Sequence, residues 1–147
     1  RIIQLTERDE ATVNRLVSIW ESSVRTTHHF LSACDIEAIR PEAAKGIADI
    51  EHLYAYKAGD IVTGFIGVAE QKIEMLFVDA AARGQGIGRQ LVAYAKEHLG
   101  AQYVDVNEQN KQGVGFYERM GFVCVGRSAL DGEGRPFPLL HMEIEGR

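Results

Sequence analysis

The segment VDAAARGQGIGRQLV, residues 78–92, places Gly84, Gly86 and Gly88 between an apolar strand pattern and an amphipathic helix pattern. Glycine lacks the Cβ atom that would keep a ligand away from the backbone. Consecutive N–H groups at a helix start form a cradle for an anion, and the helix dipole reinforces it. The segment therefore predicts either a phosphate-binding loop or a tight strand-to-helix turn in which the glycines serve packing alone.

Two familiar phosphate loops do not fit this segment. It lacks the Gly-Lys-Ser/Thr run, so the lysine and the magnesium-binding hydroxyl of a nucleoside-triphosphatase loop are missing. In the dinucleotide-binding fingerprint, the third glycine would fall on Arg89 or Leu91. A nucleotide-phosphate-binding module on another α/β fold stays open as an alternative.

Composition limits the class of protein. A chain of 147 residues, 46% hydrophobic and 25% charged, predicts one globular domain over residues 1–147. It has no apolar run near the ~20 residues of a membrane span and no signal peptide, so we expect a cytoplasmic protein without a membrane partner. Cys34 and Cys124 lack disulfide or zinc spacing and are expected to be buried free thiols, with no metal. The net charge of -5 disfavours a nucleic-acid partner, and both monomer and homodimer remain open.

The first half of the chain reads as a strand over residues 1–5 followed by two helical regions. Thr6 and Asp9 resemble a capping pair before the first helix. A second helical region begins near Ser32 and is expected to be interrupted at Pro41. The apolar stripe that predicts the first helix consists of Val13, Leu16, Val17, Trp20 and Val24.

From residue 53 onward, strand and helix patterns alternate. A hairpin is expected over residues 53–69, a central strand over 72–79 and a helix from Gly88 to Gly100. The remaining expected elements are a strand over 103–107, a helix over 110–120, and strands over 122–128 and 138–144. The sum is an α/β domain with a mixed sheet.

Two motifs in this framework resemble one family. The pattern R-x-x-G-x-G, with Arg83, Gly86 and Gly88, resembles the coenzyme A loop of the GNAT superfamily of acetyl-CoA-dependent N-acetyltransferases. The segment VNEQNKQGVGFYERMGF, residues 106–122, is similar to a later motif of that superfamily. Gly113 departs from it, because many members carry Ala there, and a helical glycine costs about 1 kcal/mol relative to alanine.

The resemblance implies a mixed, mostly antiparallel (α+β) sheet flanked by helices, with acetyl-CoA between two splayed central strands. The N–H near Leu76 becomes the candidate oxyanion donor. Asn110 would hold the coenzyme or simply cap a helix. The implied coenzyme-binding residues are Leu76, Phe77, Val78, Arg83, Gly84, Gln85, Gly86, Ile87, Gly88, Arg89, Asn110 and Tyr117.

The resemblance also places Tyr117 where a phenol can protonate the departing thiolate, although a tyrosine packed in the core is the alternative. For a general base, Glu74 lies two residues before Leu76, and strand alternation places both on one face unless a bulge intervenes. Glu74 acts directly or through water, or it is an ordinary polar or solvent-facing residue.

The stretch WESSVRTTHHFLSACD, residues 20–35, joins the two helical regions that in this superfamily cover the acceptor. It makes Trp20, His28, His29 and Phe30 candidate acceptor-binding residues, and either histidine can relay a proton. Core packing is the alternative for Trp20 and Phe30, and a surface position is the alternative for the histidines.

The leading hypothesis is an N-acetyltransferase. It transfers an acetyl group from acetyl-CoA to a primary amine of a small molecule or peptide, by direct attack in a ternary complex. The alternative is a non-catalytic acyl-CoA-binding or sensing domain. No motif identifies the acceptor.

Overall fold

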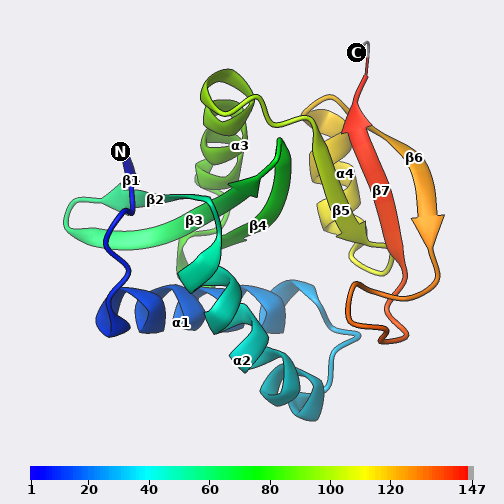
Figure 1. Ribbon diagram of the computed structural model, residues 1–147, viewed down its shortest axis with the longest axis horizontal. Coiled ribbons are helices and arrows are strands. Elements are labelled where there is room, and N and C mark those ends of the chain that lie inside the picture. The colour runs from blue at the N-terminus through cyan, green and yellow to red at the C-terminus, as the bar shows by residue number, and fades with distance from the viewer. Residues whose placement is uncertain (146–147) are drawn as a thin grey trace.

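A seven-stranded sheet runs through residues 1–145, which the computed structural model describes (Figure 1). Its strand order is β1-β2-β3-β4-β5-β7-β6. The strands are β1 (Ile2–Gln4), β2 (His52–Ala58), β3 (Ile61–Ala69), β4 (Lys72–Val78), β5 (Tyr103–Asn107), β6 (Phe122–Ser128) and β7 (Leu139–Ile144). The helices are α1 (Glu10–Thr27), α2 (Ala33–Asp49), α3 (Ile87–His98) and α4 (Lys111–Arg119), with a short 3₁₀ turn, η1 (Ala80–Ala82).

The pairing of β4 with β5 divides the sheet. This pair is parallel, and all the other neighbours are antiparallel. It has only two paired positions, Lys72 with Tyr103 and Ile73 with Val104. Beyond them the strands diverge, and Figure 1 shows the wedge that opens between them. The mostly antiparallel sheet with two splayed central strands is therefore confirmed.

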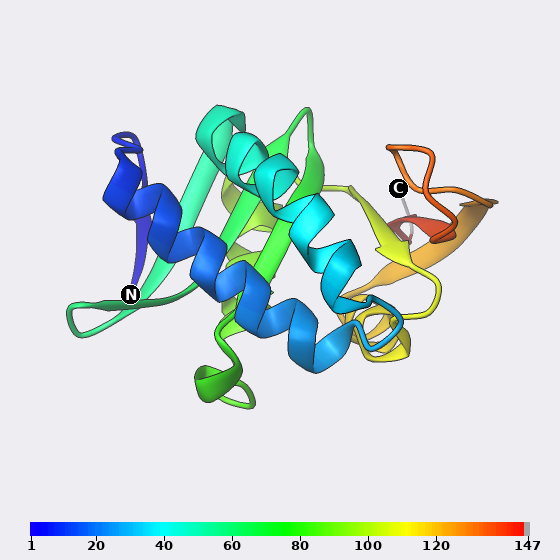
Figure 2. The same ribbon diagram turned by 90° about the horizontal axis from the view of Figure 1, so that it is seen from below.

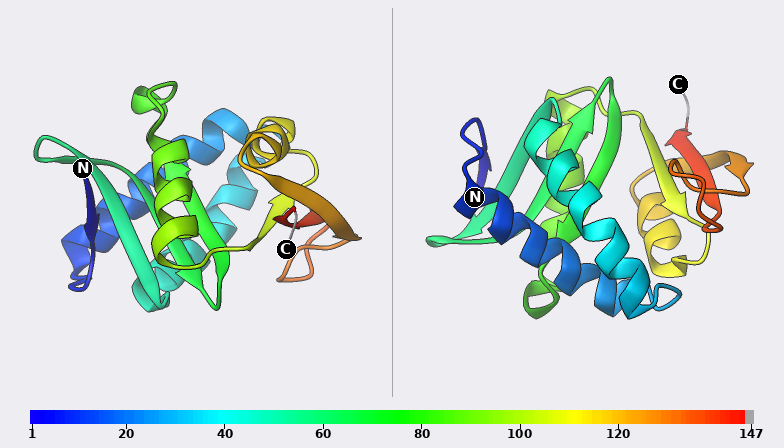
Figure 3. Two further views of the ribbon diagram at one scale, coloured as in Figure 1. Left: turned by 90° about the horizontal axis from the view of Figure 1, so that it is seen from above. Right: turned by 60° about the horizontal axis from the view of Figure 1, so that its bottom comes forward.

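The helices cover the two halves of the sheet unequally. Helices α1 and α2 lie over one face of the β1–β4 half, and α3 lies over its other face (Figures 1 and 2). Helix α4 packs on the β5–β7–β6 half, whose opposite face carries no helix (Figure 3). One core cluster joins α3 and α4 to the sheet, and a second lies beneath α1 and α2. Within residues 1–145, no helix has both the length and the apolar character needed to cross a membrane.

Three local expectations were wrong. Asp9 itself caps α1 by accepting a hydrogen bond from the Thr12 N–H at 2.9 Å, so the Thr6–Asp9 pair is not the cap. Helix α2 continues through Pro41, because a capping box at its start and the packing of its apolar face outweigh one missing N–H. Cys34 and Cys124 are exposed rather than buried, one in the first turn of α2 and the other on the edge strand β6.

Replacing Gly64 on β3 tests how tightly the start of α3 is packed on the sheet. A Cβ atom there would lie 2.9 Å from Ile87 Cγ2 and 3.3 Å from the Phe77 carbonyl oxygen. We expect Gly64→Ala to lower the free energy of unfolding by about 1–3 kcal/mol, measured by urea denaturation. Gly132→Ala is the control, because no atom lies within 4 Å of its Cβ position. Equal stability of the two variants would contradict this packing.

Candidate active site

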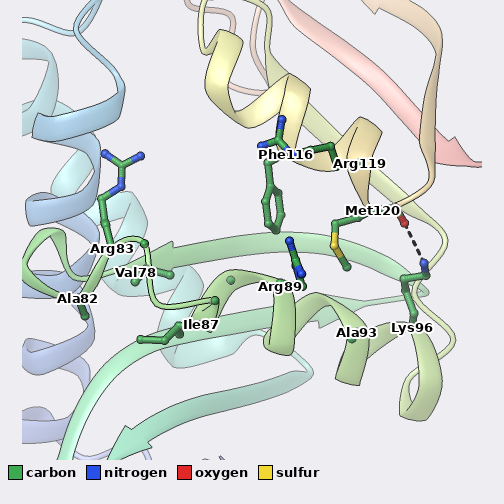
Figure 4. A pocket seen from close by; sticks show the side chains of 13 residues that line it. Val78, Ala82, Arg83, Ile87, Arg89, Ala93, Lys96, Phe116, Arg119 and Met120 are labelled. Carbon is green, nitrogen blue, oxygen red and sulfur yellow. Dashed lines mark hydrogen bonds between the residues drawn. The ribbon is translucent and has the colours of Figure 1, made fainter.

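A cavity of about 900 Å³, which we call the basic cavity, lies between the glycine loop, α3 and α4 (Figure 4). Four cationic side chains line it, and none of its lining residues is acidic. Arg89 and Lys96 are seven positions apart on α3, so they lie on the same face of that helix. The lining cations are Arg83, Arg89, Lys96 and Arg119. Such a cavity attracts a polyanion.

The glycine loop presents its backbone to this cavity. Gly84 and Gly86 have φ values of 79° and 78°, in the left-handed region that favours glycine. Gly86 is the N-cap of α3 and makes no side-chain capping hydrogen bond. The first N–H groups of α3 have no partner within the helix, so they are available to an anion in the basic cavity.

Asp79 anchors the start of this loop to α1. Its carboxylate accepts hydrogen bonds from the Ala81 N–H at 3.1 Å, the Arg15 guanidinium at 3.1 Å and the Ser22 hydroxyl at 3.2 Å. The same hydroxyl accepts a hydrogen bond from the Ala80 N–H at 3.0 Å. The pKa of Asp79 is lowered, chiefly by the Ala81 N–H and then by Arg15 and Ser22. The ionised carboxylate therefore fixes the direction in which the loop leaves β4.

A second cavity of about 490 Å³, the strand groove, follows the diverging end of β4. It shares Val78, Arg83, Gly88, Phe116 and Arg119 with the basic cavity, so the two cavities adjoin. Its other walls bring together Leu76 and Phe77 from β4 with Asn110 and Tyr117 from the second motif. Two motifs that are distant in sequence thus line one groove.

The Tyr117 side chain is held firmly in the wall of the groove. Its ring lies edge-on to Phe116 and Phe122, at centroid distances of 5.0 and 5.5 Å. Burial raises the pKa of the phenol above its ordinary value, so the neutral form, which can donate a proton, is the form present at neutral pH. Tyr117 belongs to the core and lines the groove at the same time.

Asn110 caps α4 by accepting a hydrogen bond from the Gly113 N–H at 3.1 Å. A Cβ atom on Gly113 would overlap the Asn110 side chain. Many proteins with this motif carry alanine at this position. In this chain, the contact with Asn110 explains why the residue is glycine. It leaves room for the capping side chain that also lines the strand groove.

A third cavity of about 260 Å³, the loop cavity, lies between the α1–α2 connection and the β6–β7 loop. It shares His28 and Phe77 with the strand groove. The His28 ring is 5.3 Å from that of Phe30, which is 5.7 Å from that of Phe137. Burial lowers the pKa of His28 to about 4, and the nearby His29 is a smaller cause. His28 is therefore neutral at neutral pH, and it lines both cavities.

Glu74 does not share a face with Leu76. A bulge in the pairing of β4 with β3 makes Glu74 an extra residue, since Met75 pairs with Gly67 and Ile73 with Val68. Leu76 packs toward the α3 core, whereas Glu74 lines a fourth, apolar cavity of about 410 Å³ beneath α2. Strand alternation would place Glu74 and Leu76 on one face only without a bulge, so the bulge makes that prediction wrong.

The remaining predicted positions differ in their placement. Trp20 is buried and lines both the apolar and the loop cavities. Gln85 and His29 are exposed and line none of the four cavities described above. Sequence reasoning missed Lys96 and Arg119 of the basic cavity, although the seven-residue spacing of Arg89 and Lys96 was a usable signal.

The β6–β7 loop is joined to α2 by an ion pair that the sequence analysis also missed. Both guanidinium nitrogens Nη1 and Nη2 of Arg135 donate to the Glu42 carboxylate, each at 2.9 Å. Asp131 accepts hydrogen bonds from the Glu133 and Arg135 N–H groups and holds the loop in shape. The pair closes one side of the loop cavity.

Three adjoining cavities thus follow one another past the split strand pair, and the first is lined by cations and by the glycine loop. The family model described as an acetyltransferase (GNAT) domain matches residues 11–145. The chain therefore belongs to the GNAT family of acetyltransferases. Within residues 1–145, no group of three or more His, Cys, Asp or Glu side chains is arranged to hold a metal ion.

Curated relatives agree with this assignment. The chain is 40% identical over 138 residues to peptidyl-lysine N-acetyltransferase YjaB of Escherichia coli, covering 89% of each protein. It is 39% identical over 132 residues to the protein of that name in Salmonella typhimurium, covering 87% of this chain and 88% of the relative. The chain is an acetyl-CoA-dependent N-acetyltransferase, which favours the catalytic hypothesis over a binding domain without activity.

Solved structures share the fold. The solution structure of apo-form YjaB from Escherichia coli has a TM-score of 0.87 and 34% identity, over 100% of this chain and 98% of that one. An aminoglycoside 6′-N-acetyltransferase complexed with coenzyme A has a TM-score of 0.66 and 16% identity, over 97% and 94% of the two chains. At that identity the likeness concerns the fold alone.

The partly buried His28 ring predicts a pH-dependent stability. In the unfolded chain His28 takes up a proton near its ordinary pKa of 6.5, whereas the folded chain resists this until about pH 4. Stability is therefore lost as pH falls from about 6.5 to about 4. We expect His28→Gln to flatten the decline of the thermal unfolding midpoint over this range, and the exposed His29→Gln to keep it. A His28 resonance that titrates near 6.5 would contradict the prediction.

Proposed function

We propose that this protein acetylates lysine side chains of peptides or proteins. The observation that carries the proposal is that the strand groove and the loop cavity share His28 and Phe77 in their walls, so that the proposed coenzyme side adjoins the loop cavity. Two acidic residues of the β6–β7 loop, Asp131 and Glu133, line that cavity and favour a cationic acceptor. The YjaB relatives are named for peptidyl-lysine acetylation.

The basic cavity is the proposed site for the phosphates of acetyl-CoA. The N–H groups from Gly84 to Arg89 would hold the pyrophosphate, Arg83 would face it, and Arg119 would contribute a further cation. The guanidinium of Arg83 already donates to Gln112 at 2.9 Å, which joins the loop to α4 across the groove. Gln85 and Ile87 would contribute through their backbone only, because one side chain is exposed and the other is buried in the core.

The strand groove is the proposed site of acetyl transfer. The pantetheine arm would lie along Leu76, Phe77 and Val78, whose side of the sheet is left open by the divergence from β5. The amine nitrogen attacks the thioester carbonyl carbon, so that the C–N bond forms and the C–S bond breaks. The Leu76 N–H would stabilise the oxyanion, and Tyr117 would give its proton to the departing sulfur.

The acceptor amine must lose protons to react. Glu74 is the proposed base, acting through water, because it lies on the acceptor side of β4 with Phe77, in the apolar cavity that adjoins the loop cavity. His28 is the weaker candidate, because a pKa of about 4 makes its ring a poor proton acceptor. Trp20, His28 and Phe30 would then shape the acceptor cavity. The cytoplasm is the proposed compartment, since both thiols are free and exposed.

Replacing Tyr117 tests the chemistry. Tyr117→Phe keeps the ring and its edge-on contacts but removes the hydroxyl, so we expect normal folding and coenzyme affinity with a kcat lower by about 10²- to 10⁴-fold. The measurement is release of free coenzyme A thiol with a lysine peptide. A kcat within about threefold of the parent's, too small for loss of a general acid, would assign Tyr117 to packing alone.

Replacing Gly86 tests the anion cradle. We expect Gly86→Val to weaken acetyl-CoA binding by more than about tenfold, because the valine strains the loop and crowds its backbone. Gly59→Val is the matched control: Gly59 has a similar φ of 64° but lies in the remote β2–β3 turn. Calorimetry gives both affinities. Equal losses in the two variants would show that backbone strain, and not the cradle, is responsible.

A further inference from the structure

A chain of polar side chains crosses the sheet at the point where β4 and β5 separate. Lys72 Nζ donates to Asp105 Oδ2 at 2.6 Å, His141 Nδ1 lies 2.7 Å from Asp105 Oδ1, and the Ser128 hydroxyl lies 2.6 Å from His141 Nε2. The four residues come from β4, β5, β7 and β6. Asp105 lies between Val104 and Val106, and His141 precedes Met142, and these three neighbours belong to the core beneath α3 and α4, so Asp105 and His141 face the other side of the sheet. None of the four residues lines the four cavities.

Lys72 connects this row of hydrogen-bonded side chains to the acceptor side. It is one of the two β4 residues that still pair with β5, so its bond to Asp105 spans the root of the wedge. On its other side, Lys72 Nζ lies 3.8 Å from Glu74 Oε1. One ammonium group therefore serves two carboxylates, one on each of the diverging strands.

The hydrogen bonds specify a charge state. An ionised Asp105 accepts from Lys72 and from a His141 ring protonated on Nδ1, which leaves Nε2 to accept from Ser128. Burial opposes the charge, yet the pKa of Asp105 remains below its ordinary value because Lys72 and His141 donate to it. The pKa of Lys72 is raised despite burial, chiefly by Asp105. The hydrogen bonds of Asp105 and His141 therefore keep Lys72 cationic and fixed in place.

We propose that Asp105 and His141 are positioning residues for acetyl transfer, which act by holding Lys72 between the two splayed strands and beside the Glu74 carboxylate. The inference rests on the proposed role of Glu74 as the base. The Lys72 ammonium, 3.8 Å from the Glu74 carboxylate, keeps a positive charge beside the proposed base. Other charged or titratable groups that face this region are Glu42 of α2, Tyr103 of β5 and Glu143 of β7.

A Ser–His–Asp order also suggests a hydrolase triad, in which the serine attacks a carbonyl. Such a nucleophile needs a pocket for its substrate, and Ser128 lines none of the four cavities. The two possibilities differ in their dependence on Ser128. As the last link of a positioning chain it contributes less than Asp105, whereas as a nucleophile it is indispensable.

The test compares Lys72→Met, Lys72→Arg and Asp105→Asn with the parent, by the pH dependence of kcat/KM with a lysine peptide. We expect Lys72→Met to move the acidic limb of the profile upward, since it removes a positive charge 3.8 Å from the proposed base, and Lys72→Arg, which keeps the charge, to move it less. Asp105→Asn should reduce kcat by about tenfold or more, with acetyl-CoA affinity unchanged. In a Glu74→Gln background, the shift caused by Lys72→Met should vanish.

Two controls separate positioning from general packing. Arg127→Gln removes another cross-strand ion pair, with Glu108, and should leave the profile unchanged. Nitrogen NMR of His141 provides a readout independent of turnover. We expect the Nδ1-protonated tautomer in the parent and a mixture of the two tautomers in Asp105→Asn. An Nε2-protonated ring in the parent, or an acidic limb unchanged by Lys72→Met, would overturn the inference. A loss of acetyl transfer in Ser128→Ala greater than in Asp105→Asn would also overturn it, because Ser128 is the last link of the proposed positioning residues.

Failure of the proposed function gives a different result. If the parent protein fails to acetylate any lysine peptide, the acceptor assignment is wrong, and the NMR readout alone decides whether the polar chain exists as described. If the parent acetylates the peptide but its pH profile is identical to that of Glu74→Gln, acetylation stands and the inference falls.

Discussion

The short pairing of β4 with β5 is the constraint on which the rest of this structure depends. Two paired positions hold the halves of the sheet together, and beyond them the backbone groups of both strands lack sheet partners on the facing side. Buried backbone groups without partners are costly. A substrate arm that lies between the strands can supply those partners. The divergence that weakens the sheet is therefore the same feature that makes room for acetyl-CoA.

Electrostatics divides the resulting space into two ends. Cations and free helix N–H groups gather at the end formed by α3 and α4, whereas acidic side chains gather around the β6–β7 loop. In the proposed function, the anionic coenzyme and the cationic acceptor would therefore approach from opposite sides. His28 lies between the two ends, where its partly buried, neutral ring adds no charge of its own at neutral pH.

Much of the architecture could be predicted from local patterns, because strand and helix periodicities and the two motifs act over short distances. Gly86 and Tyr117 could be singled out because their neighbours in sequence form a motif. The face of the sheet on which Glu74 lies could not be predicted, since it depends on how β4 pairs with β3. Helix α2 passes through Pro41 because distant packing outweighs a local preference. The partners Glu42 and Arg135 are 93 positions apart, beyond the reach of any local pattern.

The ion pair between Glu42 and Arg135 has a mechanical consequence. The diverging strands leave the two halves of the molecule joined by few contacts, and this pair ties α2 of one half to a loop of the other. The ion pair restrains the separation of the two halves on the open side of the wedge. Because both side chains are partly exposed, dissolved salt weakens it. If acceptors bind in the loop cavity as proposed, the range of acceptors admitted would depend on the surrounding ionic strength as well as on the cavity walls.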